Sequence, residues 1–416
     1  MKSKIFLIYL LLTAIVLNAA GGPKYRSLRA YSMGNAHVAV ADDKEAIYYN
    51  YAGLSQMGKL GNYNMHPEMG YYPHNGMDLK LNAAGMGPVN RAKHIYDLAL
   101  DLEDLYNDAE RDAEKAGTDT EDAFLDSLSA HPEYANKISR YDHLLMTIIA
   151  QADLEFAVRN FGAAVWLNAT VSPYIDGALV LPYAATDTFY IDAVAQMGGA
   201  IPVLDNLSFG LGVKVLKRQV VKVFRTDVSN FENIADTLEN RYEESRSDFF
   251  SYENIGYGMD FGVLYQATRT LRVGASLRDI FFNEVYDERI RPNLTVGLNY
   301  SPRMFNRNTA YARKVNIAFD FEDALDNERG YKPLSHLNAG LEVEQVLAAI
   351  PGYESAYRFL KLRLAGGLKG GYPTAGIGLE VLRFFDFEFA TWAEERGYYT
   401  GQAEERFYMA QVSLGF

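Results

Sequence analysis

The sequence contains no cysteine, which excludes disulfide bridges and thiolate chemistry. After residue 20 it also lacks any apolar run near the ~20 residues that a membrane-spanning helix needs. Acidic residues outnumber basic ones, and the net charge of −13 argues against a nucleic-acid partner, whose phosphates require a basic surface. If this protein enters a membrane, it must therefore do so with β-strands.

The first residues are typical of a secretory signal peptide. Two lysines precede an apolar stretch at 5–17, and Ala19 and Ala20 supply a cleavage site. A membrane anchor is the alternative, but the stretch is shorter than a bilayer-spanning helix. No cysteine follows, so a lipoprotein anchor is excluded. We predict a signal peptide at 1–20 and, because the exported chain lacks cysteine, a location in a bacterial envelope.

Tyrosine, phenylalanine and glycine are abundant, and apolar and polar residues alternate over many short segments. In the final segment, ERFYMAQVSLGF, Tyr408, Val412, Leu414 and Phe416 share one face of an extended chain. The same pattern recurs at 207–215, 259–266, 271–278, 294–300, 315–321, 360–365 and 385–390. Each segment has the length of roughly 8–12 residues that a tilted strand needs to cross hydrocarbon.

Alternation alone does not separate a membrane barrel from a soluble β-sandwich, since both have one apolar face. Glycine and charges of both signs on the polar face favour a crowded barrel lumen, where opposite charges pair across strands. A strand can cross lipid only in a closed sheet without edges. We therefore predict an all-β, transmembrane antiparallel barrel of about 14 strands over 77–416. The charged residues expected in its lumen are Asp260, Arg272, Lys361, Arg363, Asp386 and Glu388.

Connections should alternate between long outer loops and short inner turns. Counting back from Phe416, the outer loops fall at 393–406, 322–333, 280–291, 219–250 and 172–186. The inner turns fall at 382–383, 267–270, 203–206 and 159–161, while 344–357 and 301–314 are inner connections longer than this rule prefers. The first strand is then expected near 77–87, and residues 21–76 precede the barrel.

One connection, 91–150, changes from strand to helix periodicity. Ile95, Leu98, Leu102, Leu105 and Ala109 form an apolar helical stripe. Gly117 is expected to end this helix, Thr118 with Glu121 resembles a capping box, and Pro132 opens a third helix. The segment holds 14 acidic and 6 basic residues, a net charge of −8. We predict a helical, acidic cap at the barrel mouth; a solvated spacer without a ligand is the alternative.

The stretch LRAYSMGNAHVAVADDKEAIYYNYAGLSQM resembles the start of the FadL-like outer-membrane transporters, including their PorV-like and TraF-like relatives. In that family a Met-Gly segment leads through Ala-Asp-Asp to Asn-Pro-Ala-Gly-Leu. The residues that match are Arg29, Met33, Gly34, Ala39, Ala41, Asp42, Asp43, Asn50, Ala52, Gly53 and Leu54. Looser likeness extends through LSFGLGVKVLKRQ, GYGMDFGVLYQATRTLRVGASLRDI and AGGLKGGYPTAGIGLE to the final strand. The sequence departs from the pattern at Tyr51, which stands where the family has proline and leaves the turn without a preset φ.

The resemblance implies a 14-stranded barrel with an N-terminal luminal hatch at 21–76. The residues expected to hold or gate the hatch are Arg29, Met33, Asp42, Asp43, Asn50 and Gly53. It also implies that the barrel ends in an assembly signal read by the barrel assembly machinery, carried by Tyr408, Leu414 and Phe416. The function expected from the family is passive uptake of hydrophobic compounds, such as long-chain fatty acids, across the outer membrane. The outer-membrane lipids would surround the barrel. Docking of a partner in secretion or conjugation is the alternative.

An enzymatic function is not expected. The chain has seven histidines, and none sits in a recognisable metal-binding or nucleophile motif. We expect Asp386 and Glu388 to pair with Lys361 or Arg363 rather than to act as an acid and base couple. We predict no catalytic residue, no metal site and no cofactor.

Overall fold

The computed structural model describes residues 23–57, 76–86, 89–134, 147–176, 183–221, 225–227, 255–285, 288–302, 304–305, 311, 313–325, 333–350, 357–382, 384–395, 401 and 404–415. The signal peptide predicted at 1–20, the hatch residues after Met57 and the terminal Phe416 lie outside these ranges. So does most of the third helix expected from Pro132.

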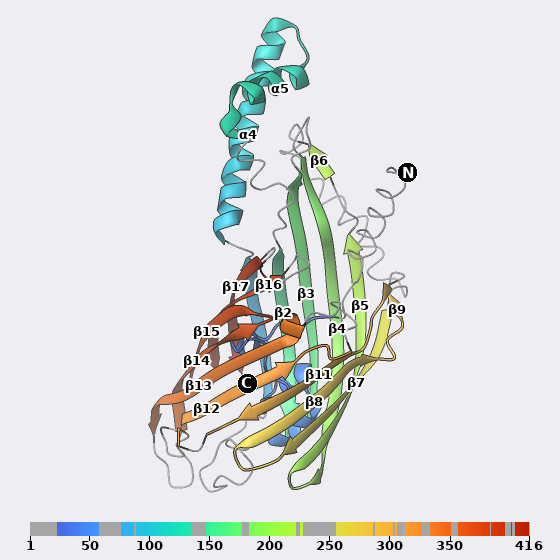
Figure 1. Cartoon of the computed structure of the whole chain (residues 1–416), viewed down its shortest axis with the longest axis vertical. Coiled ribbons are helices and arrows are strands. Elements are labelled where there is room, and N and C mark those ends of the chain that lie inside the picture. The colour runs from blue at the N-terminus through green and yellow to red at the C-terminus, as the bar shows by residue number, and fades with distance from the viewer. Residues whose placement is uncertain are drawn as a thin grey trace.

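Fourteen long strands form the wall of the molecule (Figure 1). They are β1 (Gly76–Met86), β2 (Ile148–Val158), β3 (Phe161–Asp176), β4 (Tyr183–Leu204), β5 (Leu207–Val221), β7 (Ile255–Gln266), β8 (Leu271–Ile280), β11 (Asn293–Tyr300), β12 (Arg313–Phe321), β13 (Leu337–Ile350), β14 (Tyr357–Lys369), β15 (Tyr372–Val381), β16 (Phe385–Glu395) and β17 (Glu404–Gly415). Three strands are short. β6 (Arg225–Asp227) pairs with the first residues of β4, and β9 (Glu284–Val285) pairs with β10 (Glu288–Arg289).

The wall closes on itself. Each long strand pairs antiparallel with its neighbours in chain order. The ring is completed by β3 with β4, where Phe161 lies opposite Gly199, and by β1 with β17, where Asp78 lies opposite Gly415. A ring of this kind leaves no unpaired edge among the long strands. The prediction of an antiparallel barrel of about 14 strands is confirmed.

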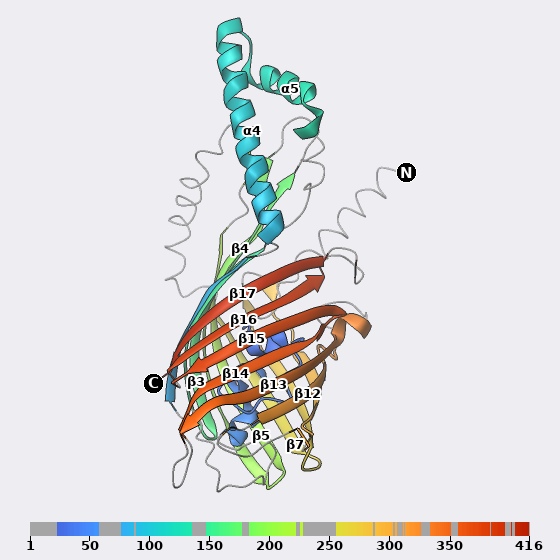
Figure 2. The ribbon, with the colours of Figure 1, turned by 90° about the vertical axis from the view of Figure 1, so that its left-hand side faces the viewer.

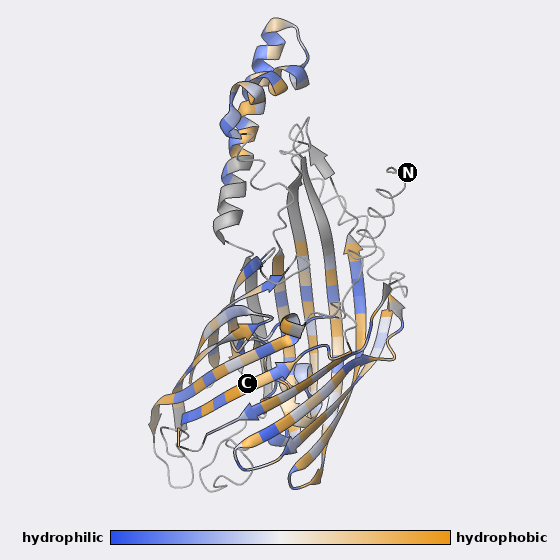
Figure 3. Cartoon of the chain, in the orientation of Figure 1, coloured by the Kyte–Doolittle hydropathy of each residue, from blue (hydrophilic) through white to orange (hydrophobic). Residues whose placement is uncertain are grey.

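The two faces of the wall differ in polarity, as the banding along the strands shows (Figure 3). On β5, Leu211, Val213 and Val215 are 40–52% exposed on the outer face, whereas Lys214 is only 6% exposed on the inner face. A soluble sandwich would bury the apolar row and expose the lysine. The alternative of a β-sandwich is therefore wrong, and the outer face is one that fits hydrocarbon.

The lengths of the strands make the wall uneven (Figures 1 and 2). β4 has 22 residues, whereas β11 has 8. The expected turns near 159–161, 203–206 and 382–383 join β2 to β3, β4 to β5 and β15 to β16. Two expected connections are too long: β3 and β4 reach into 172–186, and β13 continues to Ile350 within 344–357. The connection of β14 to β15 is a Gly370-Gly371 turn with both φ angles positive, which suits a tight hairpin.

Two additions accompany the barrel. The segment 23–57, which we call the hatch, carries α2 (Leu28–Ser32), α3 (Ala46–Tyr49) and the 3-10 helix η1 (Tyr51–Gln56), and lies inside the barrel (Figures 1 and 2). The other addition, which we call the insert, projects from one rim as α4 (Val89–Ala116) and α5 (Thr120–Ala130). In the described part of the chain no helix is both long and apolar enough to cross a membrane.

The insert packs on a small core of its own. The expected stripe contributes Leu102 and Ala109, both buried, and Phe124 of α5 is fully buried against them. Gly117, with φ of 67°, follows the end of α4 as the sequence predicts. Because α5 begins at Thr120, Asp119 precedes the helix where Thr118 was expected to cap it.

Candidate functional site: the hatch and its luminal wall

The hatch begins with a short helix held by side-chain contacts. The Ser27 hydroxyl accepts a hydrogen bond from the Ala30 amide at 3.0 Å, which caps α2. The same hydroxyl donates to the Glu45 carboxylate at 2.5 Å and thereby ties the first part of the hatch to the second. A helix of five residues is too short to be stable alone. Its conformation therefore depends on these contacts and on the surrounding wall.

Asn50 organises the second part of the hatch. It is extended (φ −161°, ψ 101°), and its side-chain oxygen accepts from the Ala52 amide at 3.1 Å. Its side-chain nitrogen donates to the Val38 carbonyl at 3.0 Å and to the Val263 carbonyl of β7 at 3.1 Å. One asparagine thus fixes the turn, links two parts of the hatch and docks both on the wall.

The residue that replaces the family's proline fills a niche in the wall. Tyr51 is 2% exposed; its ring lies against Gly198 of β4 and Gly212 of β5, and its Cβ and backbone lie against Gly210 of β5. A Cβ at any of these three glycines would overlap Tyr51. The turn at Asn50 thus forms without a proline, because the asparagine supplies the local hydrogen bond and the tyrosine supplies packing.

Other glycines of the wall bring it equally close to the hatch. A Cβ at Gly274 of β8 would meet the backbone of Val38 and Ala39, and a Cβ at Gly367 of β14 would meet the backbone of Met33. A Cβ at Gly376 of β15 would meet the Cβ of Ser32 and the backbone carbonyl of Phe389. Since backbone cannot withdraw as a flexible side chain can, these glycines are required for the hatch to fit.

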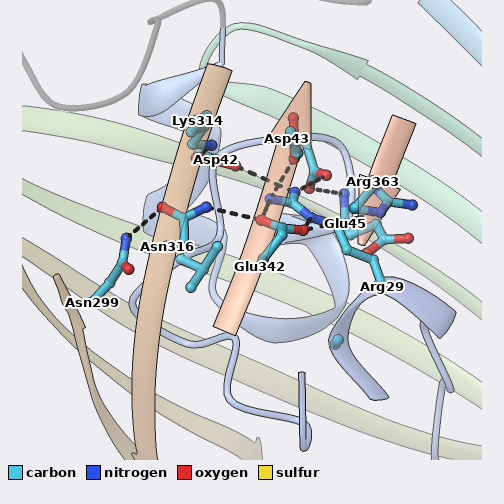
Figure 4. A network of polar contacts seen from close by, with 12 residues as sticks. Arg29, Asp42, Asp43, Glu45, Asn299, Lys314, Asn316, Glu342 and Arg363 are labelled. Carbon is cyan, nitrogen blue, oxygen red and sulfur yellow. Dashed lines mark hydrogen bonds and ion pairs between the residues drawn. The ribbon is translucent and has the colours of Figure 1, made fainter. Parts of the chain in front are cut away.

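Arg29 is the centre of the polar contacts between hatch and wall (Figure 4). Its Nε and Nη2 donate to the two oxygens of Glu342 on β13 at 2.7 and 2.8 Å, a bidentate pair. Its guanidinium also contacts Asp42 at 3.4 Å, Asp43, and Glu344 at 3.2 Å. The expected hatch residues Arg29, Asp42 and Asp43 therefore lie together.

The wall completes this cluster with two further cations. Lys314 of β12 pairs with Asp42, and Arg363 of β14 lies 4.0 Å from Glu342 and pairs with Glu388 of β16. Asn316 donates to Glu342 at 2.8 Å. The cluster thus joins the hatch to the neighbouring strands β12, β13 and β14 and, through Arg363, to Glu388 of β16 (Figure 4).

Burial and neighbouring charges set the protonation of the hatch groups. Burial lowers the pKa of Arg29, but Glu342 and Asp43 more than offset this and raise its pKa well above the usual value. Burial raises the pKa of Asp42, yet Lys314 and Arg29 hold that pKa below its ordinary value. The pKa of His37 is lowered by burial and by the Arg29 guanidinium, so its imidazole is neutral at pH 7. Arg29 and Asp42 are therefore both ionised at pH 7, next to a neutral histidine.

The remaining predicted residues are distributed around the lumen. Gly53 packs on Ala41 within the hatch, and Met33 is fully buried against the wall. Asp260 pairs with Lys214 at 2.9 Å, and Arg272 donates to the carbonyls of Ala39 and Val40 at 3.4 and 3.2 Å.

The other predicted lumen charges belong to the last strands. Lys361 pairs with Glu380 at 2.6 Å, and Asp386 is half-buried on the same face as Glu388. Tyr408 and Leu414 lie on the face of β17 opposite to the buried Gln411. The assembly role of these last two residues stays a prediction.

Sequence reasoning missed two groups of contacts. Asp320 of β12 accepts from the amides of His37 and Val38 at 2.7 and 2.9 Å, and Glu342 holds Arg29. The alternation of apolar and polar residues predicted β12, but nothing in the sequence indicated which carboxylates of the wall contact the hatch. Phe282 and Val285, in the predicted outer loop 280–291, are buried in the lumen. Their apolar character at a loop position was the signal available.

Phe282 and Val285 belong to one of several apolar clusters inside the lumen, which also contains many buried polar and charged side chains. Tyr25 stacks on Tyr48 with ring centroids 3.5 Å apart and meets Trp166 of β3 edge-on at 5.8 Å. The cluster is shared between the hatch and the wall. Its members are Tyr25, Ala30, Ala41, Ala46, Ile47, Tyr48, Tyr49, Tyr51, Leu54, Met57, Ala157, Ala164, Trp166, Val194, Ala200, Leu216, Phe282, Val285 and Ile290.

Comparison with known proteins finds structural similarity alone. No family model matches the sequence, and no curated protein matches it. The toluene transporter TodX of Pseudomonas putida is similar at 11% identity and a TM-score of 0.39, over 96% of this chain and 99% of that one. The CymD monoaromatic hydrocarbon channel gives 11% and 0.40, over 95% and 99%. A bacterial polysaccharide outer membrane secretin gives 9% and 0.38, over 83% and 100%. Similarity at this level carries no argument about what this barrel binds.

Proposed function

We propose that this protein is an outer-membrane channel for passive entry of hydrophobic compounds, with long-chain fatty acids as the substrate class. The observation that carries the proposal is the apolar cluster shared by hatch and wall. A water-filled pore has a polar interior. Here the aromatic rings of Tyr25, Tyr48 and Trp166 meet inside the lumen, and apolar and aromatic side chains of this kind typically line the binding sites of hydrophobic solutes.

Passage requires the hatch to move. The hatch is buried at Leu28, Met33 and Leu54, and the glycines of the wall meet its backbone closely. Entry of a solute between hatch and wall must therefore displace the side of the hatch that carries the aromatic residues. We infer that the cluster around Arg29 is the fixed side, because its contacts are ionic and buried.

The absence of cysteine allows a direct test of hatch movement. The hydroxyls of Ser55 in the hatch and Ser208 on β5 are 2.8 Å apart, so Ser55→Cys with Ser208→Cys places two thiols within bonding reach. Uptake of labelled oleate and labelled toluene is measured in a deletion strain that carries each variant. We expect the oxidised double variant to take up both compounds at least 10-fold more slowly than the wild type, and dithiothreitol to restore the wild-type rate. Ser55→Cys alone is the matched control and should transport normally.

Docking of a protein partner in secretion or conjugation is the second candidate. It is favoured by the insert, whose α4 of 28 residues extends about 42 Å and exposes acidic side chains away from the barrel. Under this hypothesis the oxidised double-cysteine variant and the deletion strain take up both compounds at the wild-type rate. Removal of residues 95–134 would then abolish co-purification of a partner while leaving the barrel folded.

A further inference from the structure

His37 is a buried histidine whose ring has no hydrogen-bond partner. It is 0% exposed, and neither Nδ1 nor Nε2 is bonded to any group in the described part of the chain. Buried polar atoms are nearly always paired, since an unpaired one costs free energy on folding. Its own amide donates to Asp320 at 2.7 Å, which fixes the backbone at His37. Tyr49 meets the ring edge-on at 5.1 Å and offers no acceptor to either nitrogen.

The ring faces two carboxylates of the same segment. One ligand atom each from His37, Asp43 and Glu45 lies within 4.8 Å of the other two. Glu45 is 5% exposed, and its Oε2 accepts from the Ser27 hydroxyl. Asp43 accepts from the Glu45 amide at 3.0 Å through Oδ1 and meets Arg29 through Oδ2. The two carboxylates are therefore oriented by hydrogen bonds before any ion arrives, which is how protein metal ligands are usually held.

The charge around this group favours a cation. The ion pairs linked through Arg29 contain the carboxylates of Asp42, Asp43, Glu342, Glu344 and Glu388 and the cations Arg29, Lys314 and Arg363. Negative groups outnumber positive ones in this set, and Glu45 adds a further carboxylate beside it. A buried excess of negative charge is costly unless a proton or a cation offsets it.

We propose that His37, Asp43 and Glu45 form a binding site for a divalent first-row transition ion within the hatch. One imidazole nitrogen and two carboxylate oxygens suit Zn²⁺ or Mn²⁺, whereas Mg²⁺ and Ca²⁺ take oxygen ligands. The ion would join the segment at His37 to the segment at Glu45 and so stiffen the hatch. The site lies in no sequence motif, because its ligands depend on the turn between them. This inference is independent of the solute that the barrel transports.

The experiment uses the full, untagged protein in detergent micelles after removal of metal with EDTA. Zn²⁺ and Mg²⁺ are titrated by calorimetry, and bound zinc is counted by mass spectrometry after gel filtration. We expect about one zinc per chain and at least 10-fold weaker binding of Mg²⁺. His37→Gln and Glu45→Gln should each weaken zinc binding at least 10-fold. Glu45→Gln keeps an acceptor for Ser27, so it tests the ligand charge with little disturbance.

The matched control is His336→Gln. His336 is also buried, but its Nδ1 lies 2.8 Å from the Glu322 carbonyl and no cluster of acidic oxygens surrounds it in the described residues. Its zinc binding should equal that of the wild type. A wild type that binds no zinc overturns the proposal, as does equal binding by the wild type and Glu45→Gln. Folding of each variant is checked by the shift in gel mobility on boiling.

Discussion

The hatch and the insert are both additions to the same barrel, but the hatch is stabilised by contacts with the wall and the insert by interactions within itself. The hatch has helices of only 5, 4 and 6 residues, but nearly every side chain in it is buried by the wall. The insert has a helix of 28 residues, and its ion pairs Arg111–Asp108 and Lys115–Asp112 are 65–76% exposed. The hatch therefore takes its structure from its surroundings, whereas the insert takes it from its own sequence.

Among the substitutions considered, Arg29→Ala should have the largest effect, because it removes the central ionic contact between the hatch and the wall. Arg29→Ala leaves Glu342, Asp42 and Asp43 without their central cation in a buried place. Loss of one partner of a buried ion pair typically costs about 3–5 kcal/mol. We expect the hatch to leave the lumen and the conductance of the purified protein in planar bilayers to rise at least 10-fold. Wild-type conductance together with an unchanged unfolding midpoint would show that the wall holds the hatch by packing alone.

Loss of the core of the insert should be a local event. Phe124 is fully buried against Leu102 and Ala109, so Phe124→Ala should destabilise the insert by roughly 3–5 kcal/mol. We expect circular dichroism at 222 nm to decrease, while the gel mobility shift that reports the folded barrel stays the same. A barrel that also loses its heat-modifiable mobility would mean that the insert and the wall fold as one unit.

Two adjacent glycines of β14 lie on opposite faces of the wall: Gly367 faces the lumen and Gly366 faces outward. A Cβ at Gly367 would overlap the Ala339 carbonyl of β13 and the backbone of Met33 and Gly34 in the hatch, whereas a Cβ at Gly366 meets only ordinary contact on the outer face. Gly367→Ala should therefore lower stability by about 1–3 kcal/mol through overpacking. Gly366→Ala is its matched control and should be neutral in urea unfolding. Equal losses for both variants would refute a close fit between hatch and wall.

The smallest effect is expected on the surface of the insert. Lys115 pairs with Asp112 three residues away, and both side chains are about three-quarters exposed. Such pairs contribute little because water and salt screen them. Lys115→Ala should shift the thermal midpoint by less than about 1 °C in calorimetry at 150 mM salt. A shift of several degrees would show that this side chain has a structural role beyond the exposed pair.

The sequence predicted the wall well because lipid and lumen impose a period of two. The row Leu211, Val213 and Val215 faces outward for this reason, and the tight turns follow from the same count. It also placed Arg29, Asp42 and Asp43 at the hatch contact through resemblance to a family.

The partners of the hatch could not be predicted. Arg29 and Glu342 are 313 positions apart, and their meeting depends on strand register and on the path of the hatch. The niche that Gly198, Gly210 and Gly212 make for Tyr51 has the same origin. His37 escaped notice since its neighbours at Asp43 and Glu45 come together only after the intervening turn has formed.

The great distance along the chain between Arg29 and its wall partners also bears on assembly. Arg29 lies near the N-terminus, whereas Lys314, Glu342 and Arg363 belong to strands in the last third of the chain. Contacts this remote form late, after the long intervening loop of chain has been brought together. The carboxylates around Arg29 would thus stay hydrated until the seam between β1 and β17 is joined. Burial of the hatch in the lumen would then occur only after the barrel has closed, so a buried hatch would indicate a completely assembled barrel.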